Sequence, residues 1–140
     1  QGSEMESLKR ESAGLDVEFR GYVEHADLNR ELHRADIFIS TSLVEGMSNA
    51  TLEAMAAGLP IVSTGVGGVE KMIAGNGVVI RKIGDADSIV EALDVYLKNP
   101  ALIREHGRRS RRMAEEMSWQ SVVERYVREI YAPVCATAAS

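Results

Sequence analysis

Residues 42–68 read SLVEGMSNATLEAMAAGLPIVSTGVGG, and this stretch decides the class of fold. It contains a helix with both ends marked, because Ser48 or Asn49 is a favoured N-cap and Gly58 suits the left-handed position after the last turn. Proline then prevents the helix from continuing and opens a β-branched run, Pro60–Ser63, which predicts a buried strand. The stretch is therefore a helix followed directly by a strand.

Outside this stretch, helices and strands also alternate along the chain. We expect helices over residues 4–13, 26–34, 69–73, 86–97, 101–117 and 119–131. We expect further strands over residues 17–19, 36–40 and 77–80. This order predicts an α/β fold with a Rossmann-like, doubly wound parallel sheet covered by helices on both faces. Ligands of such sheets bind beyond the carboxyl ends of the strands, here the loops after Phe19, Ser40 and Ser63.

Composition indicates a globular protein of a reducing compartment. The chain has 140 residues and a net charge of −5, which argues against nucleic acid as the main partner. Cys135 is the single cysteine, so no intramolecular disulfide can form, and no run of about eighteen apolar residues occurs. We therefore expect a cytoplasmic protein. Residues 1–3 are interpreted as a cloning remnant and residues 133–140 as a flexible tail.

The quoted stretch places two carboxylates around a predicted anion site. Glu45 lies in the loop after a strand, and Glu53 lies inside the following helix. Between them, a loop with Gly46 leads to a helix N-terminus, where free N–H groups and the helix dipole favour a diphosphate. Carboxylates accept strong hydrogen bonds from hydroxyl groups, so two of them beside a phosphate site suit a sugar nucleotide.

The same stretch closely resembles the motif of two glutamates with seven residues between them in the group-one family of GT-B glycosyltransferases. The run LEAMAAGLPIV and the paired glycines Gly67 and Gly68 follow in the order of that family. Further matching pieces, in the same order as in the family, are Val17–Gly21, Ala35–Ile39, Gly84–Asp85, Asn99–Pro100 and Met117–Trp119. The chain therefore resembles the C-terminal, nucleotide-sugar-binding domain of the family over residues 4–132.

This resemblance implies a retaining glycosyltransferase of the hexosyltransferase type, with a UDP-, GDP- or ADP-sugar as donor. Glu45 is expected to contact the hydroxyls of the transferred sugar and to serve catalysis, and Glu53 is expected to bind the ribose. The other residues expected to bind the donor are Gly46, Met47, Ser48 and Asn49 at the diphosphate or sugar, and Arg20, Gly21, Tyr22 and Val23 at the base. The family needs no obligatory metal or other cofactor, and it stabilises the departing diphosphate electrostatically.

The sequence departs from the family pattern mainly at its beginning. The family's domain opens with two further strand–helix units, which bear a basic pair that clamps the diphosphate, and neither unit is found here. The N-terminal domain that binds the saccharide, lipid or small-molecule acceptor is not found either. We therefore expect a partial domain that is inactive alone, with activity in a full-length parent. An exposed sheet edge would allow a homodimer.

Two other functions remain open from the sequence. The chain could serve as a non-catalytic module that binds a sugar nucleotide or has a purely structural role. A phosphoacceptor receiver domain needs an aspartate at the carboxyl end of a central strand, whereas Asp36 begins its strand and Ser40 ends it. The receiver reading is therefore disfavoured.

The arginines within residues 104–112 form the only basic cluster. Such a cluster suits peripheral contact with the anionic inner face of a membrane. Ordinary surface ion pairs explain it better, since Arg111 and Glu115 are spaced four residues apart on a predicted helix. The histidines His25, His33 and His106 lack the spacing of metal ligands and are interpreted as surface residues.

Overall fold

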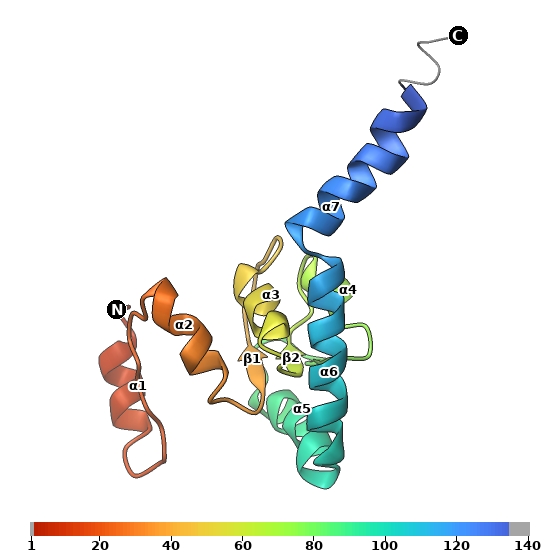
Figure 1. Cartoon of the computed structure of the whole chain (residues 1–140). Helices are drawn as coiled ribbons and strands as arrows, with labels where there is room; N and C mark the ends of the chain where they lie inside the picture. Colours follow the sequence, from red (N-terminus) through yellow and green to blue (C-terminus); the bar gives the residue numbers. More distant parts are fainter. Residues whose placement is uncertain (1, 135–140) are drawn as a thin grey trace.

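The computed structural model describes residues 2–134, which form helices around a short sheet (Figure 1). The helices are α1 (Met5–Glu11), α2 (His25–Leu32), α3 (Asn49–Ala56), α4 (Val69–Met72), α5 (Ala86–Lys98), α6 (Ala101–Glu116) and α7 (Trp119–Tyr126), which a π-helix, η1 (Val127–Tyr131), continues. The strands are β1 (Phe38–Ser40), β2 (Ile61–Ser63) and β3 (Gly77–Val79). The predicted alternation of helix and strand is confirmed from β1 onwards.

The sheet has three parallel strands in the order β1-β2-β3. Ile39 pairs with Val62, and Val62 pairs with Val78. Because β1 and β3 are the outer strands, the two ends of the order are open edges. The predicted α/β fold with a parallel sheet is confirmed, and self-association through an edge stays a prediction.

Helices cover both faces of the sheet, as expected for a doubly wound arrangement. Successive residues of a strand face opposite sides, so Ile61 and Val62 belong to two different cores. The core around Ile61 also contains the buried residues Ala54, Met55, Leu59 and Met72. The core around Val62 also contains Ile80, Ala92 and Tyr96. The hydroxyl of Tyr96 lies 2.9 Å from His106 Nδ1, and burial raises the pKa of Tyr96 to about 12.

Local signals set both ends of α3 as the sequence predicts. The Ser48 hydroxyl accepts a hydrogen bond from the backbone N–H of Thr51 at 3.3 Å. Gly58 follows the helix with a φ of 80°, a conformation that costs glycine little. Helix α3 therefore begins at Asn49 with a capped first turn and ends two residues before this glycine.

Two tertiary contacts attach helix α6 to the segments that precede strands β2 and β3. A Cβ added to Gly107 would lie 2.2 Å from the carbonyl oxygen of Gly58, so α6 and the end of α3 approach as closely as only glycine allows. The buried Asn76 donates from Nδ2 to Ser110 Oγ at 3.1 Å, and its Oδ1 accepts from the Ala74 N–H at 2.9 Å. Helix α6 is thus held at a fixed depth against the sheet.

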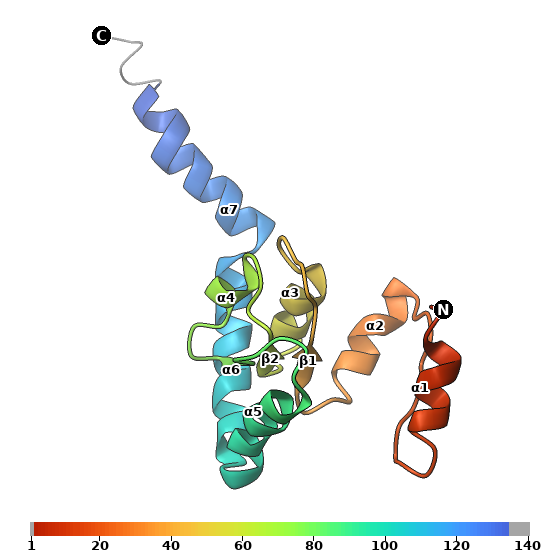
Figure 2. The same ribbon diagram turned by 180° about the vertical axis from the view of Figure 1, so that it is seen from behind.

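The prediction of a strand at residues 17–19 is wrong. This segment forms no strand, and Val17 and Phe19 are exposed. A short extended segment becomes a strand only where a neighbouring strand shares its hydrogen bonds. Figures 1 and 2 show that residues 17–19 lie between α1 and α2, to one side of the sheet. One β-branched and one aromatic residue, Val17 and Phe19, were therefore not sufficient to make it a strand.

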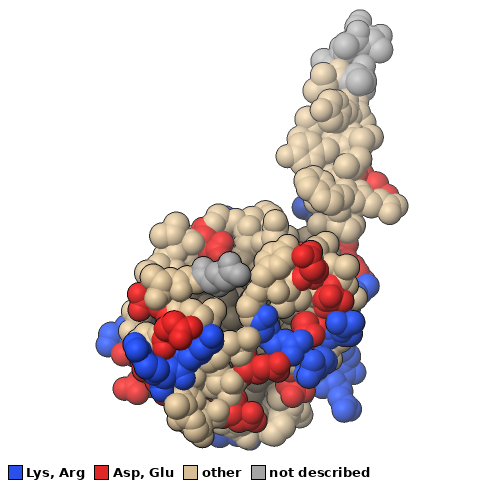
Figure 3. All heavy atoms as spheres, turned by 90° about the vertical axis from the view of Figure 1, so that its left-hand side faces the viewer, with Lys and Arg blue, Asp and Glu red and all other residues tan. Residues whose placement is uncertain are grey.

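Helix α7 and η1 form an arm that leaves the rest of the molecule (Figures 1 and 3). Its surface in Figure 3 is mostly neither acidic nor basic, and Trp119 is 85% exposed. The predicted helix over 119–131 is present, with a π-helical second half. Beyond residue 134, the predicted tail and Cys135 lie outside the described residues.

Candidate functional site

The loop after β1 carries Glu45 and is fixed by three hydroxyl groups. The Ser42 hydroxyl donates to Glu45 Oε1 at 3.0 Å and lies 3.3 Å from the Ser40 hydroxyl. The Thr64 hydroxyl, just after β2, donates to the Ser42 carbonyl at 2.6 Å. Glu45 is therefore held, half-buried, beside the carboxyl ends of β1 and β2, where the sequence predicts a ligand site.

The glycine-rich loop after β2, residues 64–68, packs directly against the backbone of the loop that carries Glu45. The Gly68 N–H donates to the Gly46 carbonyl at 3.0 Å. Gly67 has a φ of 60°, and a Cβ there would lie 1.8 Å from the Glu45 carbonyl oxygen. In the structure these glycines support the loop that carries Glu45.

The N-terminus of α3 presents unpaired backbone donors next to this loop. Ser48 caps the helix through Thr51, so the N–H groups of Asn49 and Ala50 have no partner within the helix. Asn49 and Ala50 are exposed, whereas the Thr51 side chain faces the core. Met47, in the loop before the cap, is 74% exposed. The helix end therefore offers backbone N–H groups and the positive end of its dipole to an anion.

Glu53 lies on the second turn of α3 and faces α2. Its Oε1 lies 3.7 Å from His25 Nδ1, and its side chain is 35% exposed. A cavity of about 160 Å³ between the two helices is lined by His25, Leu28, Asn29, Leu32, Glu53 and Ala56. His25 is at the surface, as predicted, but its position opposite Glu53 is a contact that the sequence did not predict.

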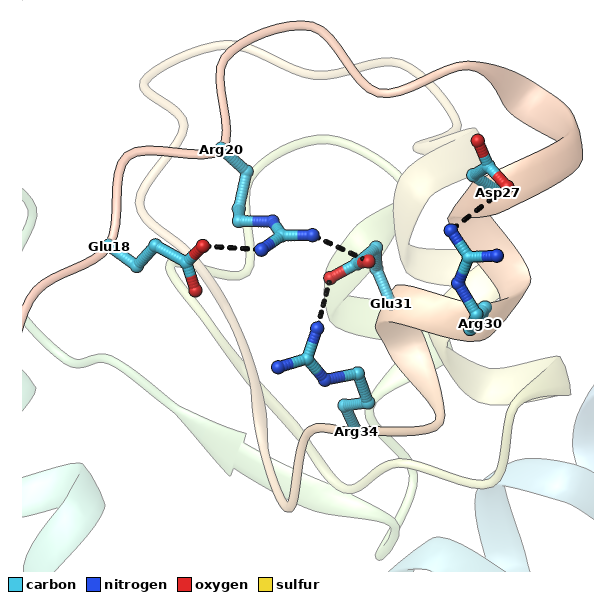
Figure 4. A network of polar contacts seen from close by, with 6 residues as sticks. All are labelled: Glu18, Arg20, Asp27, Arg30, Glu31 and Arg34. Atoms are coloured by element: carbon cyan, nitrogen blue, oxygen red, sulfur yellow. Dashed lines mark hydrogen bonds and ion pairs between the residues drawn. The ribbon is translucent and has the colours of Figure 1, made fainter.

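Arg20 is held by carboxylates of its own part of the chain (Figure 4). Its guanidinium contacts Glu18 and donates to Glu31 Oε1 at 2.7 Å, and Arg34 also contacts Glu31, at 3.5 Å. The hydrogen bond and charge of Glu18, followed by the charge of Glu31, raise the pKa of the Arg20 guanidinium. The guanidinium of Arg20 is therefore paired with carboxylates that belong to residues 18–34.

The other three residues predicted to line the base lie next to Arg20. Gly21 has a φ of 63°, Tyr22 is 77% exposed, and Val23 is half-buried. Tyr22 and Val23, together with Arg20, line a hollow of about 350 Å³ between residues 18–24 and α2. The structure thus joins Glu45 and Gly46 to residues 64–68 and places residues 20–23 in a separate hollow.

Within residues 2–134 no helix is long and apolar enough to cross a bilayer. The same part of the chain contains no group of three or more histidine, cysteine, aspartate or glutamate side chains that could hold a metal ion.

Comparison with known proteins identifies the family. The sequence model of the family "Glycosyl transferases group 1" matches residues 1–99, a range that includes Glu45, Glu53 and the glycines after β2. The chain belongs to the group 1 glycosyltransferases. The family predicted from the paired glutamates is thereby confirmed.

Several members of this family are similar in sequence. This group 1 glycosyltransferase chain is 34% identical to the glycogen synthase of Mycobacterium tuberculosis over 106 residues. The aligned residues cover 74% of this chain and 26% of that protein. It is 35% identical over 99 residues to the MMP alpha-(1->4)-mannosyltransferase of Mycolicibacterium hassiacum, covering 69% of this chain and 24% of that protein. The chain therefore spans about a quarter of the length of these relatives.

A solved structure places the fold of this group 1 glycosyltransferase chain within the GT-B architecture. The sucrose-phosphate synthase of Thermosynechococcus elongatus superposes with a TM-score of 0.79 at 25% identity. The match covers 96% of this chain and 34% of that chain. The three-stranded sheet and its helices therefore correspond to part of a GT-B fold.

Sequence reasoning missed the hydroxyl groups that hold Glu45. Ser42 stands three residues before Glu45, and Thr64 directly follows β2. A local signal existed for Ser42, because its partner Glu45 is only three residues away. Thr64 gave no such signal, since its partner lies twenty-two residues away.

Proposed function

We propose that residues 4–132 are the donor-binding part of a retaining glycosyltransferase, which transfers a sugar from a nucleoside-diphosphate sugar to an acceptor. The observation that carries this proposal is the junction of Glu45 with the N-terminus of α3. The Glu45 loop is anchored through Ser42 and Gly46, and the free N–H groups of Asn49 and Ala50 lie directly after it. A fixed carboxylate beside a diphosphate site suits a sugar nucleotide.

Each group has a role in this proposal. The N–H groups at the start of α3, with the backbone of Gly46 and Met47, hold the diphosphate and stabilise the charge that develops on it as the sugar leaves. Ser42 occupies Glu45 Oε1, which leaves Oε2 of that carboxylate for hydroxyls of the transferred sugar. Glu53 binds the ribose, and residues 20–23 contact the base.

Calorimetric titration with UDP, GDP and ADP, and with their glucose or mannose conjugates, tests this proposal. One nucleotide should bind saturably. Glu53→Ala should weaken nucleoside diphosphate binding by about tenfold or more, because a charge-assisted hydrogen bond is lost. Glu45→Ala should instead reduce the preference for the conjugate over the free nucleotide. Glu91→Ala, an exposed glutamate on α5, is the matched control.

Two results would overturn the role assignment. Equal losses in the Glu45 and Glu53 variants would show that the two carboxylates do not contact different parts of the donor. Failure of the folded protein to bind any of the nucleotides would reject donor binding by this chain. Binding without transfer, measured in a full-length parent, would instead support a non-catalytic module.

A further inference from the structure

A further cavity lies at the amino ends of the strands, whereas the Glu45 loop lies at their carboxyl ends. It measures about 490 Å³ and is bounded by the first half of α6, the end of α3 and the residues that lead into β1 and β2. Among its lining residues are His33, Asp36, Pro60, Arg104, Arg108 and Arg111. Because Asp36 and Pro60 precede their strands, this amino-end groove is distinct from the candidate donor site at the carboxyl ends.

The amino-end groove carries an excess of positive charge. Arg104, Arg108 and Arg111 follow one another at helical spacing, so they line one face of α6. Asp36 is the only carboxylate among the groove's lining residues in the described part of the chain. Three arginines therefore face one acid.

Only one of these arginines has a carboxylate partner. Arg111 donates to Glu115 Oε1 at 2.8 Å and to the Ala56 carbonyl at 2.7 Å, so it fastens α6 to the end of α3. Arg108 donates from Nε to the Arg104 carbonyl at 3.3 Å. Within residues 2–134, neither Arg104 nor Arg108 forms an ion pair with an acid. Their terminal guanidinium nitrogens remain available to an anion.

The scaffold beneath these two arginines is rigid. Gly107 lies between them in sequence and is buried against the Gly58 carbonyl, where a Cβ would lie only 2.2 Å away. Arg111 adds a hydrogen bond one turn further along α6. Arg104 and Arg108 therefore project from a helix whose position is fixed. A fixed helix loses less entropy on binding than a mobile loop does.

We propose that the amino-end groove binds a phosphate group through Arg104 and Arg108. A guanidinium presents planar, paired donors that match a phosphate, and two of them provide the charge for a dianion. The volume falls within the range of small-molecule sites, so the ligand is a phosphorylated small molecule or the headgroup of an anionic lipid. The site goes beyond the proposed donor site and does not depend on it.

An NMR titration of the intact 140-residue chain with inorganic phosphate tests the proposal. Backbone amide signals of residues 104–111, Gly58 and Leu59 should shift saturably. In the double variant Arg104→Gln/Arg108→Gln, the affinity should fall by about tenfold or more. Both side chains are exposed, so the variant should fold, which its amide spectrum will report. The double variant Arg81→Gln/Arg125→Gln removes the same charge from two exposed arginines elsewhere and should bind as the parent does.

Two arms distinguish the sources of the phosphate. Soluble phosphate should shift the groove signals in either case. Co-sedimentation with vesicles of phosphatidylcholine and phosphatidylserine, lost in the groove variant but kept in the control, would assign the group to a lipid headgroup. Phosphate binding without co-sedimentation would assign it to a soluble ligand. Shifts confined to residues 45–50, equal losses in the two double variants, or no shift at all would overturn the proposal.

Discussion

The packed body of this protein, residues 36–117, and the segment before it, residues 5–34, differ in what they bury. All the buried residues described lie between Ser48 and Ser110, and neither α1 nor α2 contains one. The body is held by two apolar cores, whereas the segment before it adds the partly buried Leu32 to one of them and makes ion pairs at its own surface. Since buried apolar area supplies most of the free energy of folding, the two regions should respond very differently to substitution.

The difference also divides the candidate donor site. The Glu45 loop belongs to the body, where Gly67 and Thr64 fix it. Arg20 belongs to the other segment, where it pairs with Glu18 and Glu31. We infer that the sugar and diphosphate half of the site is preformed and that the base half depends on contacts that the segment makes on binding.

The largest expected loss of stability comes from adding a side chain where strands β2 and β3 approach most closely. Gly77 begins β3 beside β2, and a Cβ there would lie 1.9 Å from the Ile61 carbonyl oxygen. Gly77→Ala should therefore lower the free energy of unfolding by about 3 kcal/mol or more, because backbone atoms would have to move apart. Urea denaturation followed by circular dichroism measures it.

Gly46→Ala is the matched control for this substitution. A Cβ at Gly46 meets no atom within 4 Å, and its φ is not positive. Its stability should stay within about 0.5 kcal/mol of the parent. If both alanine variants unfold at the same urea concentration, the body is not packed as closely as the contacts of Gly77 require.

An intermediate effect is expected at the buried polar link between the turn before β3 and α6. Asn76→Ala removes the bonds to Ser110 and Ala74 and leaves a buried hydroxyl and a backbone N–H without these partners. Unfolding free energy should fall by about 2 kcal/mol. Asn99→Ala, at an exposed position, should change it by less than about 0.5 kcal/mol. Thermal denaturation of the pair provides the comparison, and equal melting temperatures would contradict the role of Asn76.

The smallest effect is expected in the N-terminal segment. Arg20→Ala breaks the contacts with Glu18 and Glu31, but exposed ion pairs contribute little. The urea midpoint of the body should not shift, and the change in unfolding free energy should stay below about 0.5 kcal/mol. A loss above about 1 kcal/mol would show that the segment unfolds together with the body and would end the distinction between the two regions.

The sequence by itself determined the elements whose signals are local. Ser48, Gly58 and Pro60 mark the ends of α3 and the start of β2, because a cap, a left-handed residue and a proline act on the backbone within a few residues. The spacing of Glu45 and Glu53 around that helix identified the family for the same reason, since a short motif is complete within one loop and one helix.

Only the tertiary structure decided features that need a distant partner. Val17 and Phe19 are residue types that favour strands, but no strand lies beside them, and Trp119 is a large aromatic residue that lies on an exposed arm. The close approaches of Gly67 to the Glu45 carbonyl and of Gly107 to the Gly58 carbonyl join residues that are distant in sequence. Strand pairing and close approach depend on which surfaces meet in space, and a single sequence encodes that only through the whole fold.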